Sequence, residues 1–352
     1  MVNHPSTARE ADEIDLFELV AAVWAQKALI IGCIVVATGV AAAYAFLSKP
    51  VYEARLYLQP PTLNDIADFN YGRTREAELT PYTIGDVYSV FTRNLQGESL
   101  RRAFFTDVYL PSLSEEQRQG SQDALYSDYL NTLTIGGPTK DLPDRYSVAV
   151  YGSDPTQATA WVKAFADKAG AQAETEMITN VEREGEVRAR NIGQQITTLQ
   201  ETETRVRTDA ISRLKEALNV AQAIGLENPP IITGSVAEEV SAVMDGQLTY
   251  MRGTKALNAE IKNLEERKTD DPFIANLRAL QIKQSFYQAL QVSPDTVAVF
   301  RQDGPINVPD RPIKPRKGLI LVGGVIAGGI LGLLFALGRF FIAQRRKSLH
   351  GL

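Results

Sequence analysis

Two uncharged, apolar stretches dominate the hydropathy pattern of this chain. The first covers residues 28–48 and the second covers residues 318–338, so each has 21 residues. As a helix, each would span roughly 31 Å, about the thickness of the hydrocarbon core of a bilayer. The pattern predicts two transmembrane helices at these positions, with a water-soluble domain between them.

The first stretch also has features of a cleaved signal peptide. Lys27 precedes it, and Ala43-Tyr44-Ala45 is an acceptable small-x-small cleavage site. Against cleavage, the stretch is longer than a typical signal core. The tail before it, residues 1–27, holds five acidic residues against only Arg9 and Lys27. We therefore expect a retained span.

Two spans place both ends of the chain on one side of the membrane. Basic residues flank the second span on both sides. Long translocated domains largely escape the positive-inside rule, so the short basic tail at 339–352 carries more weight. We expect both tails, 1–27 and 339–352, in the cytoplasm and the large domain outside the inner membrane.

The first part of the large domain mixes strand and helix signals. Residues 51–58 alternate in polarity, and 132–135 and 146–151 are two further strand candidates. Residues 84–105 have apolar side chains at helical spacing. We expect 49–153 to form the first part of a membrane-proximal base that contains both helices and strands.

A long run without proline comes next. Asp154-Pro155 supplies a helix N-cap followed by proline at the first helical position, and a turn signal at 225–230 ends the run. If it is continuous, the helix is roughly 105 Å long. Three internal glycines, Gly170, Gly185 and Gly193, weaken the case for continuity.

Two further helices are expected to pack on the long one. The first covers about 236–268, and the second is capped by Asp271-Pro272; both have apolar stripes. They predict an antiparallel hairpin with the Pro229-Pro230 turn at its tip, so that 154–296 forms a long helical arm. A compact helical bundle is the alternative.

Residues 297–317 lead back to the membrane. Val297–Arg301 is short and apolar and is a candidate return strand to the base. Spaced prolines then favour an extended, stiff connector before the second span: Pro305, Pro309, Pro312 and Pro315. The whole pattern predicts an α+β membrane protein in which two transmembrane helices flank a mixed α/β base with a long, extended helical hairpin arm.

Composition narrows the chemistry of the large domain. The histidines, His4 and His350, lie in the tails, and the only cysteine, Cys33, lies in the first apolar stretch. Ser-His-Asp and Cys-His catalysis and the usual zinc sites therefore lack their residues, and no phosphate-binding glycine motif occurs. We expect no catalytic site, metal or cofactor, although paired carboxylates leave a glycan-cleaving enzyme open. The net charge of −5 argues against a nucleic-acid partner.

The second apolar stretch has two linked G-x-x-x-G units: Gly324, Gly328 and Gly332. Small residues at this spacing let transmembrane helices approach closely. Gly32, Gly39 and the run at 41–43 are candidate counterparts in the first stretch. We expect these glycines to pack helices together, within one chain or between chains; the alternative is that glycine is simply common in membrane helices.

Charged residues such as Arg183, Glu186, Arg188 and Arg190 recur along the long helix. They are most simply a solvated face. A functional role would need identical subunits whose faces meet.

A series of segments resembles one known family. Pro50-Val51-Tyr52-Glu53-Ala54 follows the first span, the segment at 214–221 lies on the arm, and 250–257 and 270–273 precede the proline-rich connector. Their order, within the two-span frame, resembles the chain-length determinant proteins (Wzz-type polysaccharide co-polymerases) of bacterial inner membranes. The resemblance covers nearly the whole chain.

This resemblance implies a ring-shaped homo-oligomer, a multi-pass inner-membrane protein with its bulk in the periplasm. It implies control of the modal length of lipopolysaccharide O-antigen or a similar polymer, together with a polymerase and its lipid-linked glycan, and no enzymatic activity. Since 14 residues follow Gly338, the cytoplasmic kinase domain of the capsule branch is not expected. The alternative is a periplasmic adaptor of a secretion or efflux system, which also uses a helical hairpin but usually has one N-terminal anchor.

Overall fold

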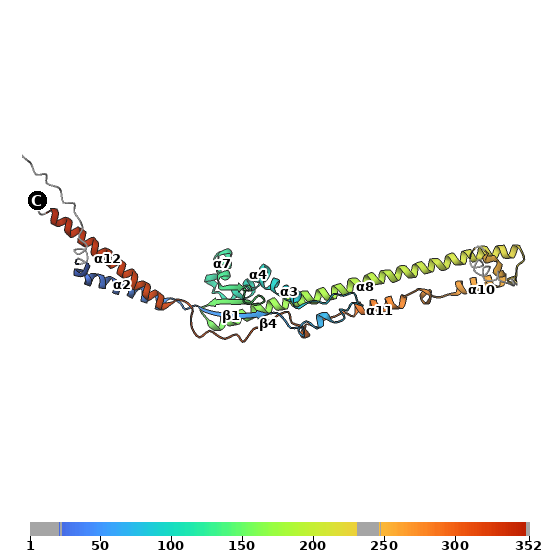
Figure 1. Cartoon of the computed structure of the whole chain (residues 1–352), viewed down its shortest axis with the longest axis horizontal. Coiled ribbons are helices and arrows are strands. Elements are labelled where there is room, and N and C mark those ends of the chain that lie inside the picture. Colours follow the sequence, from blue (N-terminus) through green and yellow to red (C-terminus); the bar gives the residue numbers. More distant parts are fainter. Residues whose placement is uncertain (1–20, 22, 231–245, 247, 350–352) are drawn as a thin grey trace, which may run out of the picture. The chain divides into compact units, whose positions relative to one another are not determined.

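The structure is a computed structural model that describes residues 21, 23–230, 246 and 248–349 (Figure 1). The chain divides into two compact units. Unit 1 contains Met1–Pro60, Phe91–Ala171 and Phe300–Leu352, and unit 2 contains Pro61–Val90 and Gln172–Val299. The helix α8 (Pro155–Ala223) begins in unit 1 and continues without interruption into unit 2.

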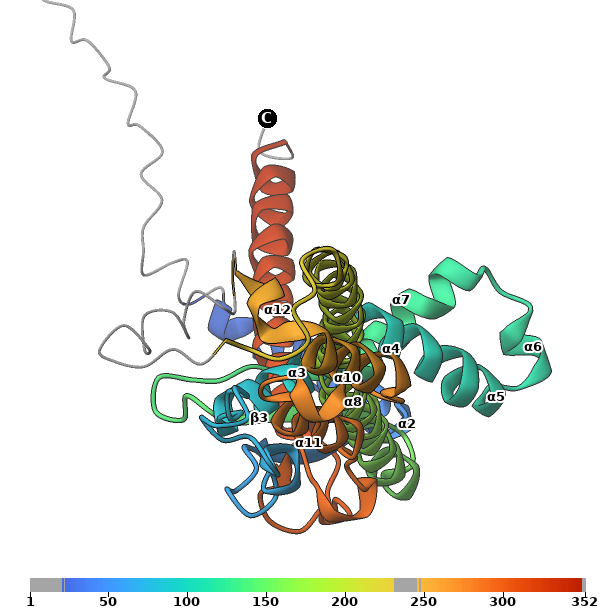
Figure 2. The same ribbon diagram turned by 90° about the vertical axis from the view of Figure 1, so that its right-hand side faces the viewer.

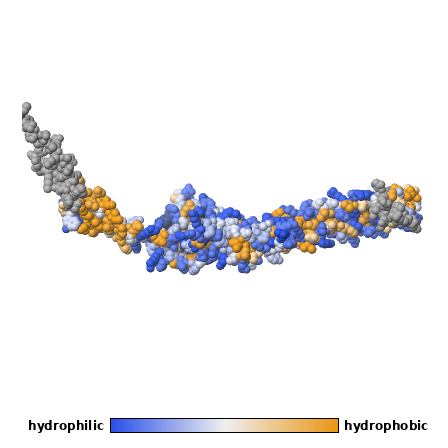
Figure 3. All heavy atoms as spheres, viewed as in Figure 1, coloured by the Kyte–Doolittle hydropathy of each residue, from blue (hydrophilic) through white to orange (hydrophobic). Residues whose placement is uncertain are grey.

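Unit 1 contains two helices that are long and apolar enough to cross a membrane. They are α2 (Lys27–Leu47) and α12 (Lys317–Leu349), whose apolar part ends at Ile342. The two lie side by side, and Figure 3 shows their surface as a band of hydrophobic side chains. Both predicted helices are present, and the second continues as a helix beyond the predicted end at residue 338.

The base in unit 1 is built on a four-stranded antiparallel sheet in the order β2-β3-β1-β4. The strands are β1 (Tyr52–Gln59), β2 (Leu133–Gly136), β3 (Tyr146–Gly152) and β4 (Arg301–Gln302). In the central pair, Leu56 lies opposite Val148, and both side chains are buried. The polar alternation in β1 thus correctly predicted the face that packs on the core.

The predicted return strand, Val297–Arg301, is wrong over most of its length. Strand pairing is confined to Arg301–Gln302. The preceding apolar residues are buried in unit 2, where the Ala298 N–H donates to the carbonyl of Asp65 at 2.9 Å. An apolar run of this length has the composition of a strand, but its backbone hydrogen bonds go to a loop.

Helices of unit 1 surround an aromatic core. The predicted helix at 84–105 is two helices, α3 (Ile84–Gln96) and α4 (Glu98–Phe104), because the extended backbone of Gly97 interrupts it. A short π-helix η2 (Phe105–Tyr109), α5 (Leu110–Ser112), α6 (Glu115–Arg118) and α7 (Gln122–Thr132) follow around a lobe (Figure 2). The ring of Phe104 packs edge-on against Phe165 of α8, with the ring centroids 5.3 Å apart.

The long helix α8 is continuous over 69 residues, or roughly 104 Å. The Asp154 carboxylate accepts the Thr156 N–H at 2.8 Å, which confirms the predicted cap, and Gly225 at φ +72° follows its end. The three internal glycines do not break it. They lie where other segments come closest: a Cβ on Gly185 would lie 2.8 Å from the Tyr287 carbonyl oxygen.

In unit 2, the returning chain runs antiparallel to α8. It contains η3 (Thr249–Arg252), α10 (Gly253–Glu266), η4 (Asp271–Phe273), α11 (Leu277–Gln288) and η5 (Pro294–Thr296), and the other segment of the unit contains η1 (Asp68–Asn70). Leu257 of α10 packs with Leu214 and Ala221, whereas Tyr287 of α11 packs with Ala189, earlier in α8. The order of these contacts confirms the predicted hairpin.

The boundaries of the returning helices differ from the prediction. The expected helix at 236–268 corresponds in its described part to α10, and residues 231–245 and 247 lie outside the described residues. Asp271-Pro272 starts only the 3-10 turn η4. The third helix starts at Leu277, because Asn276 takes a left-handed conformation with φ +62°.

Two glycines of α8 provide a test of these contacts. We expect Gly185→Ala to lower the free energy of unfolding by about 1–2 kcal/mol, since the new methyl group meets a backbone carbonyl that cannot move alone. At Gly193 the nearest atom is the amide nitrogen of the flexible Gln284 side chain, so Gly193→Ala is expected to be neutral or stabilising by up to about 1 kcal/mol. Thermal unfolding of the purified protein followed by circular dichroism measures both; equal effects would contradict the assignment.

Candidate functional site

The three glycines predicted to pack helices together face α2 from α12. A Cβ on Gly328 would lie 2.6 Å from the Cα of Ile34, and on Gly324 and Gly332 it would lie 2.7 and 2.8 Å from atoms of α2. Real Cβ atoms do not approach other heavy atoms below 3.0 Å. Glycine at these positions therefore allows the two backbones to come this close.

The candidate counterparts in α2 are only partly correct. Ala41 contacts Gly324, but a Cβ on Gly32 or Gly39 would have no heavy atom within 4 Å. The residues of α2 that do face α12, such as Ile30 and Ile34, are spaced by one helical turn. Gly32 and Gly39 are out of phase with them and point away from α12.

Contacts at both ends hold the helix pair in register. Near the start of α2, the Gln26 side chain donates from Nε2 to the carbonyl of Ala336 at 3.1 Å. Near the other end, the ammonium of Lys317 lies 4.6 Å from the ring centroid of Phe46. The two helices are thus held against sliding by contacts at both ends of the pair.

The proline-rich connector is hydrogen-bonded to the start of the sheet. Val51, directly before β1, donates its N–H to Lys314 at 3.0 Å and accepts the Ile313 N–H at 2.8 Å. The four prolines of the connector lie around this bridge and are not buried: Pro305, Pro309, Pro312 and Pro315. The segment that follows α2 and the segment that precedes α12 are therefore joined to each other next to the two helices.

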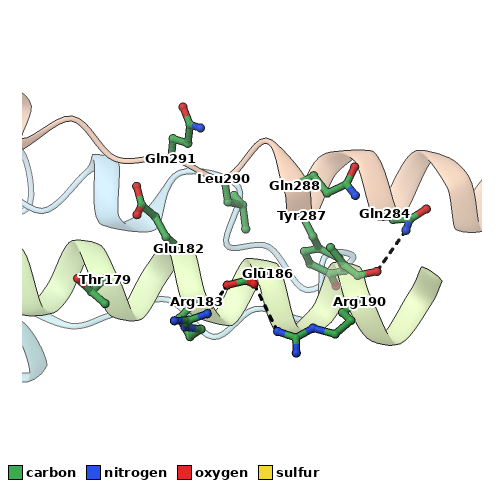
Figure 4. A pocket seen from close by; sticks show the side chains of 11 residues that line it. Thr179, Glu182, Arg183, Glu186, Arg190, Gln284, Tyr287, Gln288, Leu290 and Gln291 are labelled. Atoms are coloured by element: carbon green, nitrogen blue, oxygen red, sulfur yellow. Dashed lines mark hydrogen bonds and ion pairs between the residues drawn. The ribbon is translucent and has the colours of Figure 1, made fainter. Parts of the chain in front are cut away.

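A polar groove of about 640 Å³ lies between α8 and α11 in unit 2 (Figure 4). Glu186 forms ion pairs with Arg183 at 2.6 Å and with Arg190 at 3.4 Å. The facing wall contributes three amides: Gln284, Gln288 and Gln291. Both arginine side chains are 67% exposed, as predicted for a solvated face, whereas Arg188 is half-buried and lies over the ring of Tyr287.

The groove has the donors and acceptors to bind a polar molecule, and two of its lining side chains are carboxylates, Glu182 and Glu186. The carboxylate of Glu186 is paired with two guanidinium groups. Tyr287, in the groove wall, is buried and donates its hydroxyl to the Ala77 carbonyl at 2.5 Å. Within the described residues, no group of histidine, cysteine and carboxylate side chains is placed to hold a metal ion.

Other carboxylates of unit 2 show shifted acidity with clear causes. A hydrogen bond from Lys283 lowers the pKa of Glu78 and raises the pKa of the lysine itself. Partial burial raises the pKa of Glu174. None of these three residues lines the polar groove, so their shifts belong to packing and surface pairing.

Two arginines fasten the other segments of unit 2 to α8. Arg73 donates to the carbonyls of Phe69 and Thr80 and to Glu184 of α8 at 2.7 Å. Further along α8, Arg207 binds the turn after α10. It donates to the Asp270 carboxylate at 3.0 Å and to the carbonyls of Leu264 and Arg267. Neither cluster could be found from the sequence, because an isolated arginine has no pattern that distinguishes it from a solvated one.

Comparisons with known proteins find similarity to proteins described as determining or modulating polysaccharide chain length. The family model described as chain length determinant protein matches residues 12–108. The chain is 23% identical over 339 residues to a chain length determinant protein of Escherichia coli O111:H-, covering 96% of this chain and 95% of that protein. It is 22% identical over 350 residues to an ECA polysaccharide chain length modulation protein of Salmonella typhimurium (strain LT2), with 93% and 95% covered.

Solved structures share the fold. A full-length bacterial polysaccharide co-polymerase superposes with a TM-score of 0.67 at 20% identity, over 94% of this chain and 99% of that chain. A Shigella flexneri lipopolysaccharide O-antigen chain-length regulator superposes with a TM-score of 0.51 at 14% identity, over 74% and 99%. The first of these likenesses extends over nearly the whole chain.

The Arg207 cluster makes a testable contribution to stability. Asp270 is 6% exposed and the Arg207 side chain is 20% exposed, so Asp270→Ala leaves a half-buried guanidinium without its carboxylate and is expected to cost about 3 kcal/mol of unfolding free energy. The matched control is Glu265→Ala, which removes a surface pair with Lys215 and should cost less than about 1 kcal/mol. Chemical denaturation of the two variants measures the difference in their free energies of unfolding. Equal losses of stability would show that the Arg207 cluster contributes no more than a surface ion pair.

Proposed function

We propose that this chain is a member of the chain length determinant family and that it regulates the length of a bacterial surface polysaccharide, such as lipopolysaccharide O-antigen. The observation that carries the proposal is the full-length similarity to a chain length determinant protein, 96% of one chain on 95% of the other. That similarity includes both candidate membrane helices, the sheet and the hairpin together. The adaptor alternative is not favoured, since the full-length relatives are chain length proteins.

The proposed location is the bacterial inner membrane. Both tails lie in the cytoplasm and the units between the two helices lie in the periplasm. Two helices able to cross a membrane, α2 and α12, support an even number of crossings. The basic residues after the second helix, Arg345, Arg346 and Lys347, support the cytoplasmic side for the tails.

Regulation by this chain is proposed to be structural and to involve no catalysis of its own. The similarity to proteins described as chain length determinant and chain length modulation proteins supports this. Copies of the chain assemble into a ring, which acts as a scaffold beside the polymerase and its lipid-linked glycan. Such a scaffold biases when polymerisation stops.

Within each copy, the membrane helices have a mechanical role in the proposal. The glycine contacts of α12 hold α2 at a fixed distance, and the bridge between Val51 and Lys314 fixes the sheet to both helices. A ring of such copies keeps a constant spacing only if each anchor is rigid. The packing glycines Gly324, Gly328 and Gly332 and the proline connector are therefore proposed to support assembly.

Deletion of the gene tests the main proposal. We expect the polysaccharide ladder on a gel to lose its modal band cluster and to show a broad distribution of lengths, because the polymerase then stops without bias. The full-length gene on a plasmid should restore the mode. A ladder with the same mode in the deletion strain would refute length control.

A substitution at the helix interface tests the role of the anchors. Gly328→Leu is expected to disturb the oligomer or the modal length, since the side chain meets the backbone of Ile34 and Cys33. Gly329→Leu adds the same volume to the neighbouring position, where a Cβ meets no heavy atom within 4 Å, and should leave both unchanged. Chemical cross-linking and the polysaccharide ladder measure the two effects; normal behaviour of Gly328→Leu in both assays counts against the proposal.

A further inference from the structure

The pair of membrane helices contains an apolar groove of about 480 Å³ near the start of α2 and the later turns of α12. Six residues supply its apolar walls: Leu29 and Cys33 from α2, and Leu334, Phe335, Gly338 and Ile342 from α12. The groove is open, since the Phe335 side chain is 61% exposed. Apolar side chains bordering a groove of this kind are suited to a hydrocarbon chain.

Gly338 creates part of the space. A Cβ built on this glycine would have no heavy atom within 4 Å. A larger side chain there would therefore extend into the groove and not into α2. This distinguishes Gly338 from the packing glycines Gly324, Gly328 and Gly332, which touch the other helix.

Basic residues lie at the same end of the groove. Arg339 lines it directly. The two helices are antiparallel, so the hydrogen bond from Gln26 to Ala336 places Lys27, the next residue of α2, level with Phe335, about one turn from Arg339. The Lys27 ammonium lies over the ring of Trp24, 5.6 Å from the ring centroid. An apolar groove that ends at basic residues is complementary to a lipid with an anionic headgroup.

We propose that this groove binds one acyl chain of an anionic phospholipid, whose phosphate lies against Arg339 and Lys27. With the tails in the cytoplasm, this lipid belongs to the cytoplasmic leaflet, at the opposite end of the helices from the Val51–Lys314 bridge. The proposal rests on the two helices crossing a bilayer and not on length control. A second copy of the helix pair is a poorer occupant, because its own basic residues would face these like charges.

Native mass spectrometry of the full-length protein in detergent, titrated with phosphatidylglycerol or phosphatidylcholine, tests the proposal. We expect one phosphatidylglycerol per chain to be retained preferentially. Arg339→Gln should weaken its retention about fivefold, the contribution of one basic residue near an anionic headgroup. Gly338→Leu should abolish retention by filling the groove.

Two matched controls lie at the other end of α12. Gly318→Leu adds the same side chain at a glycine that is also in open space, and Arg316→Gln removes an exposed basic residue; both should retain the lipid as the unchanged protein does. Circular dichroism confirms that each variant is folded.

Three results would overturn the proposal. Retention of phosphatidylglycerol by Gly338→Leu would exclude the groove. Equal retention of phosphatidylcholine, or no effect of Arg339→Gln, would exclude recognition of the anionic headgroup. Loss of oligomers in Gly338→Leu with unchanged lipid retention would identify a second copy of the chain as the occupant.

Discussion

The described fold of unit 2 depends on one requirement, that the apolar seam of α8 be covered. A helix of 69 residues gains little from helical propensity alone, and most helical stability in proteins comes from packing an apolar face. No single partner covers this seam. The returning chain does so in steps, first with α10 on Leu214 and Ala221 and then with α11 and the loop at Ala77 on Ala189.

This requirement explains why polar clamps and glycines occur at the same helix. Short covering segments bury little apolar area each, so their positions are fixed by specific contacts. Arg207 closes the turn between α10 and α11, and Arg73 closes the loop before α3, each by donating to backbone carbonyls and to one carboxylate. At Gly185 the chain comes so close that any side chain would collide with a carbonyl. The helix therefore remains continuous through its glycines, because each of them is a position where another segment packs closely on α8.

The elements whose residues follow a simple period were predictable. The two apolar stretches became α2 and α12, and the alternation at 51–58 became β1 with the expected buried face. The predicted secondary structure was wrong where contacts with a segment distant in the sequence determine the local conformation. Val297–Arg301 has the composition of a strand, but the Ala298 N–H goes to Asp65, far away in the sequence. Asp271-Pro272 is a valid helix start by local rules, and the left-handed Asn276 still delays the helix.

For the glycines of α12, too, the sequence pattern predicted part of the interface, and the rest depends on contacts between helices. Spacing alone predicted that the three glycines of α12 share a face, because i, i+4 and i+8 always do in a helix. Spacing could not show which residues of α2 they meet, since this depends on the rotation of α2 about its axis. Gly32 and Gly39 were candidates by residue type, but Ile30 and Ile34 occupy the interface.

The sheet of the base is connected to α2 and α12 by short, hydrogen-bonded segments. Val51 pairs with Lys314 within a few residues of the ends of both helices, and β1 starts at the next residue. A proline-rich segment in this position resists bending, and its backbone bonds at Ile313 and Lys314 remove the remaining freedom. Sliding of α12 along α2 would have to break these bonds or the contact between Lys317 and Phe46. The glycine interface fixes the separation of the two helices, and the bridge between Val51 and Lys314 fixes the start of the sheet to them.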